Sequence, residues 1–291
     1  MLRSAMFSVL KPLLRFAASR PHALRHVVDP SELREALDAL GIRAGEMNDA
    51  SEVLGALFEC LNRAPGLSGA DDAGTGNVSV VDRTFGLMLS EEVRCNVTTC
   101  HRVTHIVPQH VEYFMIITAT GLRDVRAVID AAPAEHISTG RIIREIESQN
   151  VKRCDNDPPH HGCNTPTPVT RTLHNIPAVF TLQLVWEPDV PGEAIAGTLS
   201  LVDTILDLKE VFAGSNCPGN MPTYALHGMF CYYGQHYFAF INRGPLEPES
   251  TQEWVMFDDA TVLAVGNWSQ VIAKCRAGRI QPSVLFYQQH R

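Results

Sequence analysis

Hydrophobic spacing predicts a helical N-terminal part. In residues 31–40, apolar side chains recur three and four positions apart, which indicates an amphipathic helix that Asp29 or Ser31 can cap. The same periodicity predicts a second helix that begins near Asn48 or Asp49. Its inner face would carry Val53, Leu54, Leu57, Phe58 and Leu61.

After a loop rich in Gly, Ala, Ser and Asp at residues 65–79, the pattern changes to short runs of β-branched and aromatic residues. These runs predict strands at 93–99, 111–118, 178–186, 229–233, 236–242, 254–257 and 284–287. Two helical patterns interrupt them, at 138–147 and 195–212. Helices followed by mostly antiparallel strands predict an α+β fold.

Composition narrows the class of protein. A chain of 291 residues with 45% hydrophobic content can bury a substantial core. Its formal net charge of −8 argues against a surface that binds nucleic acid throughout, although it allows a local basic patch. No run approaches 18 apolar residues, so we expect no membrane span. Eight cysteines are too sparse for a disulfide-stapled module, which favours a reducing compartment such as the cytoplasm or nucleus.

The first 28 residues differ from the rest of the chain in composition. They contain five basic residues, no acidic residue and apolar positions at roughly helical spacing. We favour an amphipathic helix packed on the domain. The alternative is a mitochondrial transit peptide, which applies if Met1 is the true start.

The densest candidate chemistry lies near the C-terminus. Two predicted strands meet at a turn formed by Gly234 and Gln235, which puts His236 at the start of the second strand. The next strand would return Asp258 to its side. A carboxylate that holds one nitrogen of a histidine fixes the tautomer and stabilises the imidazolium, as in nucleophilic triads. The alternative is a packed core histidine.

Four cysteines form two pairs, Cys95 with Cys100 and Cys154 with Cys163. Tetrahedral zinc needs two such pairs brought together by hairpins. The spacings of four and eight intervening residues are looser than the two residues usual in zinc ribbons. We expect a zinc site, with reduced structural thiols as the alternative. The residues that can replace a cysteine ligand are His101, His160 and His161.

Several motifs resemble the ubiquitin-specific proteases, which are papain-like cysteine peptidases. Tyr233-Gly-Gln-His-Tyr-Phe-Ala-Phe, Trp254-x-x-Phe-Asp-Asp-x-x-Val and Pro282-x-Val-Leu-Phe-Tyr resemble the His box of that family. Met47-Asn-Asp-Ala-Ser-Glu-Val-Leu resembles its Gln-Gln-Asp-Ala-x-Glu-Phe-Leu helix, and Leu173-x-x-Ile-Pro-x-Val-Phe resembles the start of its palm. The form of the His box that begins Cys231-Tyr-Tyr-Gly-Gln-His-Tyr looks similar to that of plant-type ubiquitin hydrolase-related proteins, the branch it resembles most.

The resemblance covers residues 30–291 and implies one papain-like α+β domain over 1–291. A helical thumb would occupy about 1–65, β fingers about 90–165 and an antiparallel β palm about 166–291. Partners would be ubiquitin or ubiquitinated proteins, with no nucleic acid. The resemblance also supports zinc, because these proteases often carry a four-cysteine site at the tip of the fingers.

The same resemblance implies roles at the candidate site. His236 would be the general base, Asp258 its orienting carboxylate and Asp259 a secondary polar group. Tyr237 and Trp254 would form walls of the channel for the ubiquitin tail. Gln235 stands where the family commonly has Gly, which would narrow or rearrange that channel.

The family's Cys box is not found before Asp49, and the first cysteine of the sequence is Cys60. Neither Cys60 nor Cys217, Cys231 or Cys275 is a strong candidate nucleophile. Two hypotheses follow from this departure. Either the sequence is part of a longer cysteine deubiquitinase and lacks the nucleophile, or it is a catalytically inactive ubiquitin-binding pseudoenzyme.

Overall fold

The computed structural model describes residues 31–38, 49–63, 68–70, 77–106, 111–129, 136–154, 162–212, 214–215, 221–245 and 248–290. The chain divides into two compact units, residues 1–69 and 70–291. None of the described helices is long and apolar enough to cross a membrane. The basic segment before Asp29 lies outside the described residues.

The first unit contains the two predicted helices, α2 (Ser31–Asp38) and α3 (Ala50–Arg63). Asp49 caps α3, because its carboxylate accepts hydrogen bonds from the backbone N–H groups of Ser51 at 2.8 Å and Glu52 at 3.3 Å. Phe58 is buried, as expected for the inner face of this helix.

The second unit is built on a sheet of eight strands in the order β14-β13-β12-β11-β15-β8-β5, with β9 also paired to β11. All these pairings are antiparallel except that of β5 with β8. The strands are β5 (Met115–Thr118), β8 (Val179–Val185), β9 (Ile205–Asp207), β11 (Thr223–Tyr233), β12 (His236–Asn242), β13 (Trp254–Asp258), β14 (Thr261–Gly266) and β15 (Gln281–Gln289).

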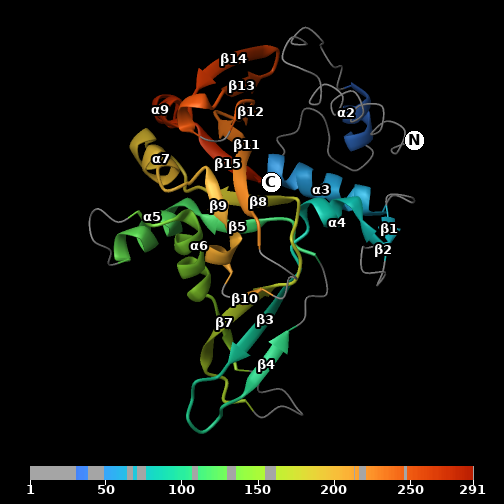
Figure 1. Ribbon diagram of the computed structural model, residues 1–291, viewed down its shortest axis with the longest axis vertical. Coiled ribbons are helices and arrows are strands. Elements are labelled where there is room, and N and C mark those ends of the chain that lie inside the picture. The colour runs from blue at the N-terminus through green and yellow to red at the C-terminus, as the bar shows by residue number, and fades with distance from the viewer. Residues whose placement is uncertain are drawn as a thin grey trace. The chain divides into compact units, whose positions relative to one another are not determined.

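Helices accompany this sheet, and α5, α6 and α7 gather along one side of the unit (Figure 1). The helices are α4 (Val80–Phe85), α5 (Ala119–Val128), α6 (Thr139–Ser148), α7 (Gly192–Leu199), α8 (Leu208–Val211) and α9 (Trp268–Gly278), with a 3-10 turn at Glu249–Thr251. Large aromatic side chains from different strands, including Phe180, Tyr224 and Tyr287, are fully buried in the core. The predicted α+β architecture is confirmed.

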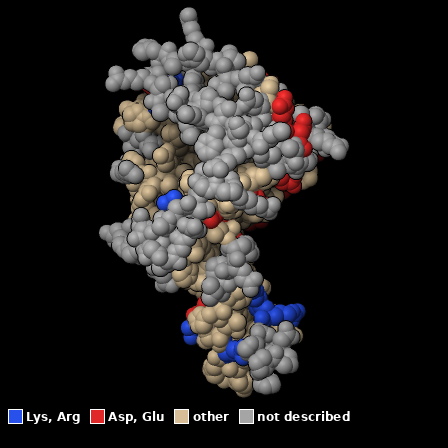
Figure 2. Space-filling view, turned by 90° about the vertical axis from the view of Figure 1, so that its right-hand side faces the viewer, with Lys and Arg blue, Asp and Glu red and all other residues tan. Residues whose placement is uncertain are grey.

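A smaller sheet extends from the same unit, where β3, β4 and β7 project below the larger sheet (Figure 1). Its order is β10-β7-β3-β4, with β6 also paired to β7. Lys and Arg side chains lie at its far end (Figure 2), so a local basic region exists despite the negative net charge. The strands are β3 (Leu89–Arg94), β4 (Val103–Ile106), β6 (Val151–Arg153), β7 (Pro166–Leu173) and β10 (Gly214–Ser215). Two short strands, β1 (Ser68–Ala70) and β2 (Asn77–Ser79), precede α4.

The predicted helix over 195–212 is wrong. The chain forms α7, leaves the helix after Leu199, pairs with β11 as β9 and makes one turn of α8. Thr139, which begins α6, accounts for the break, because its N–H donates to the Asp203 carboxylate at 2.8 Å and its hydroxyl accepts from the Asp203 N–H at 2.6 Å. These long-range bonds outweigh the local helical pattern.

A second difference concerns the strand predicted at 93–99, which ends at Arg94. The residues that follow form a turn, in which the N–H of Cys100 donates to the carbonyl of Val97.

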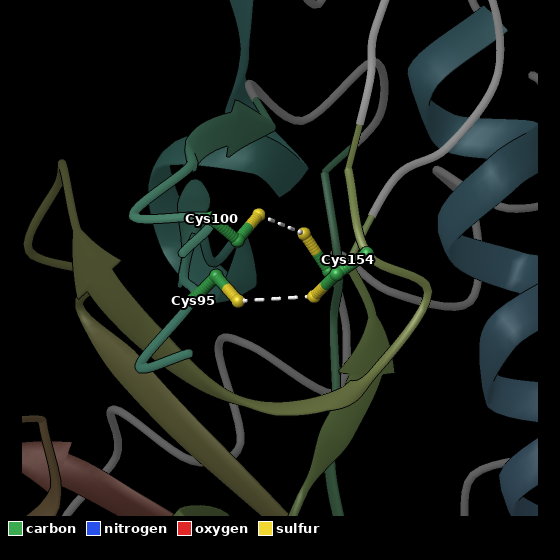
Figure 3. Close-up of side chains that lie close together, drawn as sticks. Cys95, Cys100 and Cys154 are labelled. Carbon is green, nitrogen blue, oxygen red and sulfur yellow. Dashed lines mark hydrogen bonds between the residues drawn. The ribbon is translucent and has the colours of Figure 1, made fainter. Parts of the chain in front are cut away.

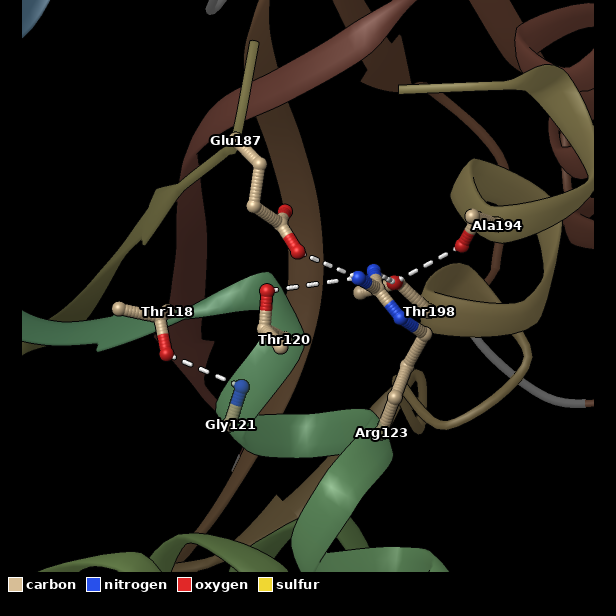
Figure 4. Close-up of polar contacts among 7 residues, drawn as sticks. All are labelled: Thr118, Thr120, Gly121, Arg123, Glu187, Ala194 and Thr198. Carbon is tan, nitrogen blue, oxygen red and sulfur yellow. Dashed lines mark hydrogen bonds and ion pairs between the residues drawn. The ribbon is translucent and has the colours of Figure 1, made fainter. Parts of the chain in front are cut away.

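Arg123 of α5 links two other elements of the larger sheet's helical side (Figure 4). Its guanidinium donates to the Glu187 carboxylate at 2.6 Å, just after β8, and to the Thr198 hydroxyl of α7 at 2.7 Å. Thr198 in turn donates to the carbonyl of Ala194. One planar cation thus fixes α5, α7 and the end of β8 relative to one another.

An ion-pair network joins the smaller sheet to α6. Glu91 of β3 contacts Lys152 of β6 and Arg171 of β7, and Arg171 also lies 3.2 Å from Glu147 of α6. Burial raises the pKa of Glu147, and the charge of Arg171 only partly offsets this. Burial also acts to raise the pKa of Glu91, but hydrogen bonds and charges from Lys152 and Arg171 together hold it below its usual value.

The β11–β12 hairpin closes with two residues in the left-handed region, Gly234 at φ 56° and Gln235 at φ 68°. Tyr233 and His236 pair on either side of this two-residue loop. Positive φ at both central positions is typical of a type I′ turn, in which Gly is favoured. The turn geometry therefore explains why Gly suits the position that Gln235 occupies.

Replacing Glu147 by Gln tests the ionic network. The raised pKa means that folded Glu147 binds its proton more tightly than unfolded Glu147, so its contribution to stability falls as pH rises through the folded pKa. We expect the unfolding free energy of Glu147→Gln to improve relative to the parent as pH rises above about 4, the ordinary pKa of a glutamate, until folded Glu147 is ionised. Glu91→Gln is the matched control, with the opposite trend because its pKa is lowered. A pH-independent difference for Glu147→Gln would contradict this account.

Changing the turn tests its backbone strain. Gln235→Gly should raise the unfolding free energy by about 0.5–1 kcal/mol, because Gly adopts positive φ without a Cβ penalty. Gly234→Ala should lower it by about 1–2 kcal/mol. A Cβ added at Gly234 would meet nothing within 4 Å, so that loss would come from the backbone alone. Urea denaturation with an unchanged m-value measures both changes, and equal effects of the two substitutions would refute the turn assignment.

Candidate functional site

The predicted His–carboxylate pair forms where β12 begins and β13 ends. His236 begins β12 and Asp258 ends β13. The pairing of Ala239 with Phe257 makes Asp258 a diagonal neighbour of His236, so both side chains leave the same face. His236 Nε2 lies 2.6 Å from Asp258 Oδ1, a hydrogen-bond distance.

The other ring nitrogen of His236 remains available. A carboxylate at Nε2 favours the tautomer with its proton there, which leaves Nδ1 as the basic atom. Within the described part of the chain, Nδ1 makes no hydrogen bond. The His236 and Asp258 side chains are 42% and 37% exposed, so a reacting group can reach them. Phe238 stacks on the imidazole with ring centroids 6.0 Å apart, a support that the sequence analysis missed although alternation along β12 puts both on one face.

The structure places the expected channel residues in different surroundings. Tyr237 is half-buried and packs on Tyr232 with ring centroids 5.0 Å apart. Gln235 stands in the turn next to His236, and Asp259 is exposed in the turn after Asp258.

Trp254 requires a correction, because its side chain is only 1% exposed and does not line a surface channel. It packs on Trp268 in the core, with ring centroids 5.3 Å apart. Its indole N–H donates to buried Gln252, which also accepts the N–H of Trp268. An aromatic residue at a strand start fits a core position as readily as a channel wall, so the sequence pattern could not separate the two.

No described cysteine of the second unit lies within hydrogen-bond distance of His236. Cys231 and Cys275 are fully buried, and burial raises the pKa of Cys231 well above its usual value and that of Cys275 to about 12. Because the thiolate is the nucleophile, these two sulfurs are held in the unreactive form. Cys60 lies on α3 of the first unit, and Cys217 lies outside the described residues.

The four paired cysteines come together at the smaller sheet, where sulfurs from two hairpins face one another (Figure 3). The sulfurs of Cys95 and Cys163 are 3.4 Å apart, and those of Cys100 and Cys154 are 3.7 Å apart. All four lie within 4.8 Å of one another. A disulfide would need about 2.05 Å, so these are free thiols.

Matching backbone geometry positions the two pairs. The N–H of Cys95 donates to the carbonyl of Arg102, and the N–H of Cys154 donates to that of Thr165. In each hairpin the residue after the second cysteine is left-handed, His101 at φ 50° and Asn164 at φ 59°. Asn and His are among the residues that tolerate this conformation, a signal that the sequence analysis did not use.

The cluster could bind a metal ion. With metal–sulfur bonds of about 2.3 Å, the edges of a tetrahedron measure about 3.8 Å, close to both observed sulfur pairs. The hydrogen bond with the Thr165 hydroxyl lowers the pKa of Cys163 to about 6. A backbone hydrogen bond involving Cys163 acts to lower the pKa of Cys154, but burial and neighbouring sulfurs raise it to about 11. His101 is not part of the group, and His160 and His161 lie outside the described residues.

Comparison with known proteins agrees with this geometry. The family model "Ubiquitin carboxyl-terminal hydrolase" matches residues 3–287. Rat "Ubiquitin carboxyl-terminal hydrolase 54" is 28% identical over 98% of this chain and 17% of its own length. Human "Ubiquitin carboxyl-terminal hydrolase 53" is 27% identical over 98% of this chain and 26% of its own length. The chain thus spans about a sixth and a quarter of these relatives.

Among solved structures, the chain is similar to the Saccharomyces cerevisiae Pan2 pseudoubiquitin hydrolase–RNA exonuclease module in complex with A7 RNA. That likeness has a TM-score of 0.49 and 13% identity over 82% of this chain and 36% of the other. The family match accords with the α+β, papain-like fold and extends over nearly the whole sequence. The chain therefore belongs to the ubiquitin carboxyl-terminal hydrolase family.

Proposed function

We propose that this chain is a deubiquitinase-type cysteine peptidase domain that binds ubiquitin or ubiquitinated proteins. Its reaction would be thiol-dependent hydrolysis after the C-terminal glycine of ubiquitin. The observation that carries the proposal is the 2.6 Å contact between His236 and Asp258, with Nδ1 left accessible. In this assignment the larger sheet serves as the palm and the smaller sheet as the fingers.

The chemistry of the pair follows from its geometry. Nδ1 of His236 accepts the proton of a thiol, and Asp258 stabilises the resulting imidazolium through Nε2–H. The thiolate attacks the carbonyl carbon, and His236 then returns the proton to the leaving amine. Water, activated by the same nitrogen, hydrolyses the thioester.

This reaction also requires a thiol that can reach His236. The described cysteines of the second unit are either deeply buried or gathered at the smaller sheet. The reaction therefore needs Cys60, Cys217 or a family-type Cys box that the printed sequence does not contain.

A non-catalytic ubiquitin-binding role is the second candidate. It is favoured by one observation, namely that no described thiol of the second unit lies beside Nδ1 of His236. In that case the His236–Asp258 hydrogen bond would only stabilise the end of the β12–β13 ladder.

A ubiquitin probe with a C-terminal electrophile tests both candidates. If the chain supplies its own thiol, a covalent adduct should form, and His236→Ala should slow it by about 10²-fold or more because the base is lost. His136→Ala, at an exposed histidine paired with Asp203, is the control and should keep the parent rate.

Ubiquitin binding should survive in both variants, as measured by calorimetry. Binding without an adduct would favour the non-catalytic role. A folded sample that shows no binding would overturn both candidates.

We further propose that the four-cysteine cluster holds a structural zinc ion. Support comes from the tetrahedral spacing of the sulfurs and from the two matching hairpins that present them. Zinc would join β3 and β4 to β6 and β7 at the far end of the smaller sheet, where the structure offers little apolar core.

Metal analysis of freshly purified protein tests this assignment. We expect about one zinc per chain, and loss of zinc together with a lower Tm in Cys154→Ser, because three remaining ligands hold the ion poorly. Cys60→Ser, which changes a cysteine outside the cluster, should keep both zinc and Tm. Folded parent protein without zinc would end the proposal.

A further inference from the structure

A third ligand-type side chain stands beside the His236–Asp258 pair. A ring nitrogen of His236 and carboxylate oxygens of Asp258 and Asp259 all lie within 4.8 Å of one another. Asp259 is exposed, and in the described part of the chain its side chain makes no hydrogen bond or ion pair.

We propose that His236, Asp258 and Asp259 form an exchangeable binding site for a divalent first-row transition ion, and that an ion bound there switches the His236–Asp258 pair off. Ion binding itself is independent of the proposed peptidase function, whereas its regulatory consequence rests on it.

Backbone conformation brings the third ligand into place. Asp258 pairs with Thr261 across a two-residue loop, so Asp259 occupies the first position of a tight turn between β13 and β14. Asp259 has φ 48°, in the left-handed region that Asp tolerates better than most residues. The chain therefore reverses at Asp259, and consecutive carboxylates approach the same ring nitrogen instead of pointing to opposite faces as they would along a strand.

The distances suit a small cation after modest rotation of exposed side chains. Ligand atoms about 2.1 Å from an ion are separated by about 3.0–3.4 Å from one another. The His236–Asp258 contact of 2.6 Å would open slightly and the Asp259 carboxylate would move inward. Both members of the pair are more than a third exposed, so neither movement meets a packed core.

Charge also favours a cation. Neither carboxylate forms an ion pair with Lys or Arg in the described part of the chain, and His236 supplies the only cationic partner when it is protonated. One imidazole with two carboxylates is a ligand set for Zn²⁺ or Mn²⁺, whereas the four-cysteine cluster offers only thiols, which Mn²⁺ binds poorly.

Binding would block the proposed chemistry for a simple reason. An ion held by Nε2 and Asp258 replaces the proton that the two groups share. The carboxylate then no longer stabilises an imidazolium, and the nearby positive charge makes Nδ1 a weaker base.

Mn²⁺ titration of zinc-loaded protein, with free Mn²⁺ detected by electron paramagnetic resonance, tests the site. The parent should bind one Mn²⁺ with a Kd below about 1 mM, and Asp259→Asn should weaken binding by about tenfold or more. Asp189→Asn is the matched control, because Asp189 is also an exposed aspartate with positive φ, 54°, but lies outside the group. Equal binding by the parent and Asp259→Asn, or no binding by the parent up to about 1 mM, would overturn the proposal.

Histidine ring NMR tests the ion site independently of whether the chain is a peptidase. Added Zn²⁺ should shift the ring nitrogens of His236 in the parent and in Asp189→Asn, but not in Asp259→Asn, whether or not the protein binds ubiquitin. Shifts that are equal in all three proteins would indicate adventitious binding and refute the site. If the ubiquitin probe reacts, Mn²⁺ should slow the reaction of the parent and Asp189→Asn more than that of Asp259→Asn, each compared with its own metal-free rate.

Discussion

The register of the antiparallel ladder through β11, β12 and β13 is the constraint on which the candidate site depends. A slip of one residue would turn His236 to the opposite face of the sheet and separate it from Asp258. Two features hold this register. The tight turn at Gly234 and Gln235 fixes the β11–β12 pairing, and buried Trp254, opposite Asn242, anchors β13 in the core.

Both candidate sites lie at the ends of hairpins and use left-handed residues to direct their ligands. Gln235 and Asp259 flank the His236–Asp258 pair, whereas His101 and Asn164 close the two cysteine hairpins. Such residues strain the backbone slightly, and strands on either side stabilise them. The sheets therefore supply rigidity, and the turns supply the positions of the reactive atoms.

The fold also separates the cysteines by environment. Four converge at the smaller sheet, where they can bind a metal, and Cys231 and Cys275 are sealed in the core of the larger one. This separation leaves His236 and Asp258 without a described thiol of the second unit beside them. What the site does therefore depends on whether a thiol reaches His236 and on whether an ion binds there.

The sequence by itself determined the features that depend on neighbours along the chain. Asp49 caps α3, the Gly234–Gln235 turn sets the hairpin, and the short segment from His236 to Asp258 specifies two paired strands. Tertiary structure decided what depends on distant partners. Asp203 bonded to Thr139 breaks the helix predicted at 195–212, Trp268 and Gln252 hold Trp254 in the core, and two hairpins far apart in sequence bring four sulfurs together. Local patterns report backbone preference and burial period, whereas these outcomes are set by long-range hydrogen bonds and packing that no local pattern contains.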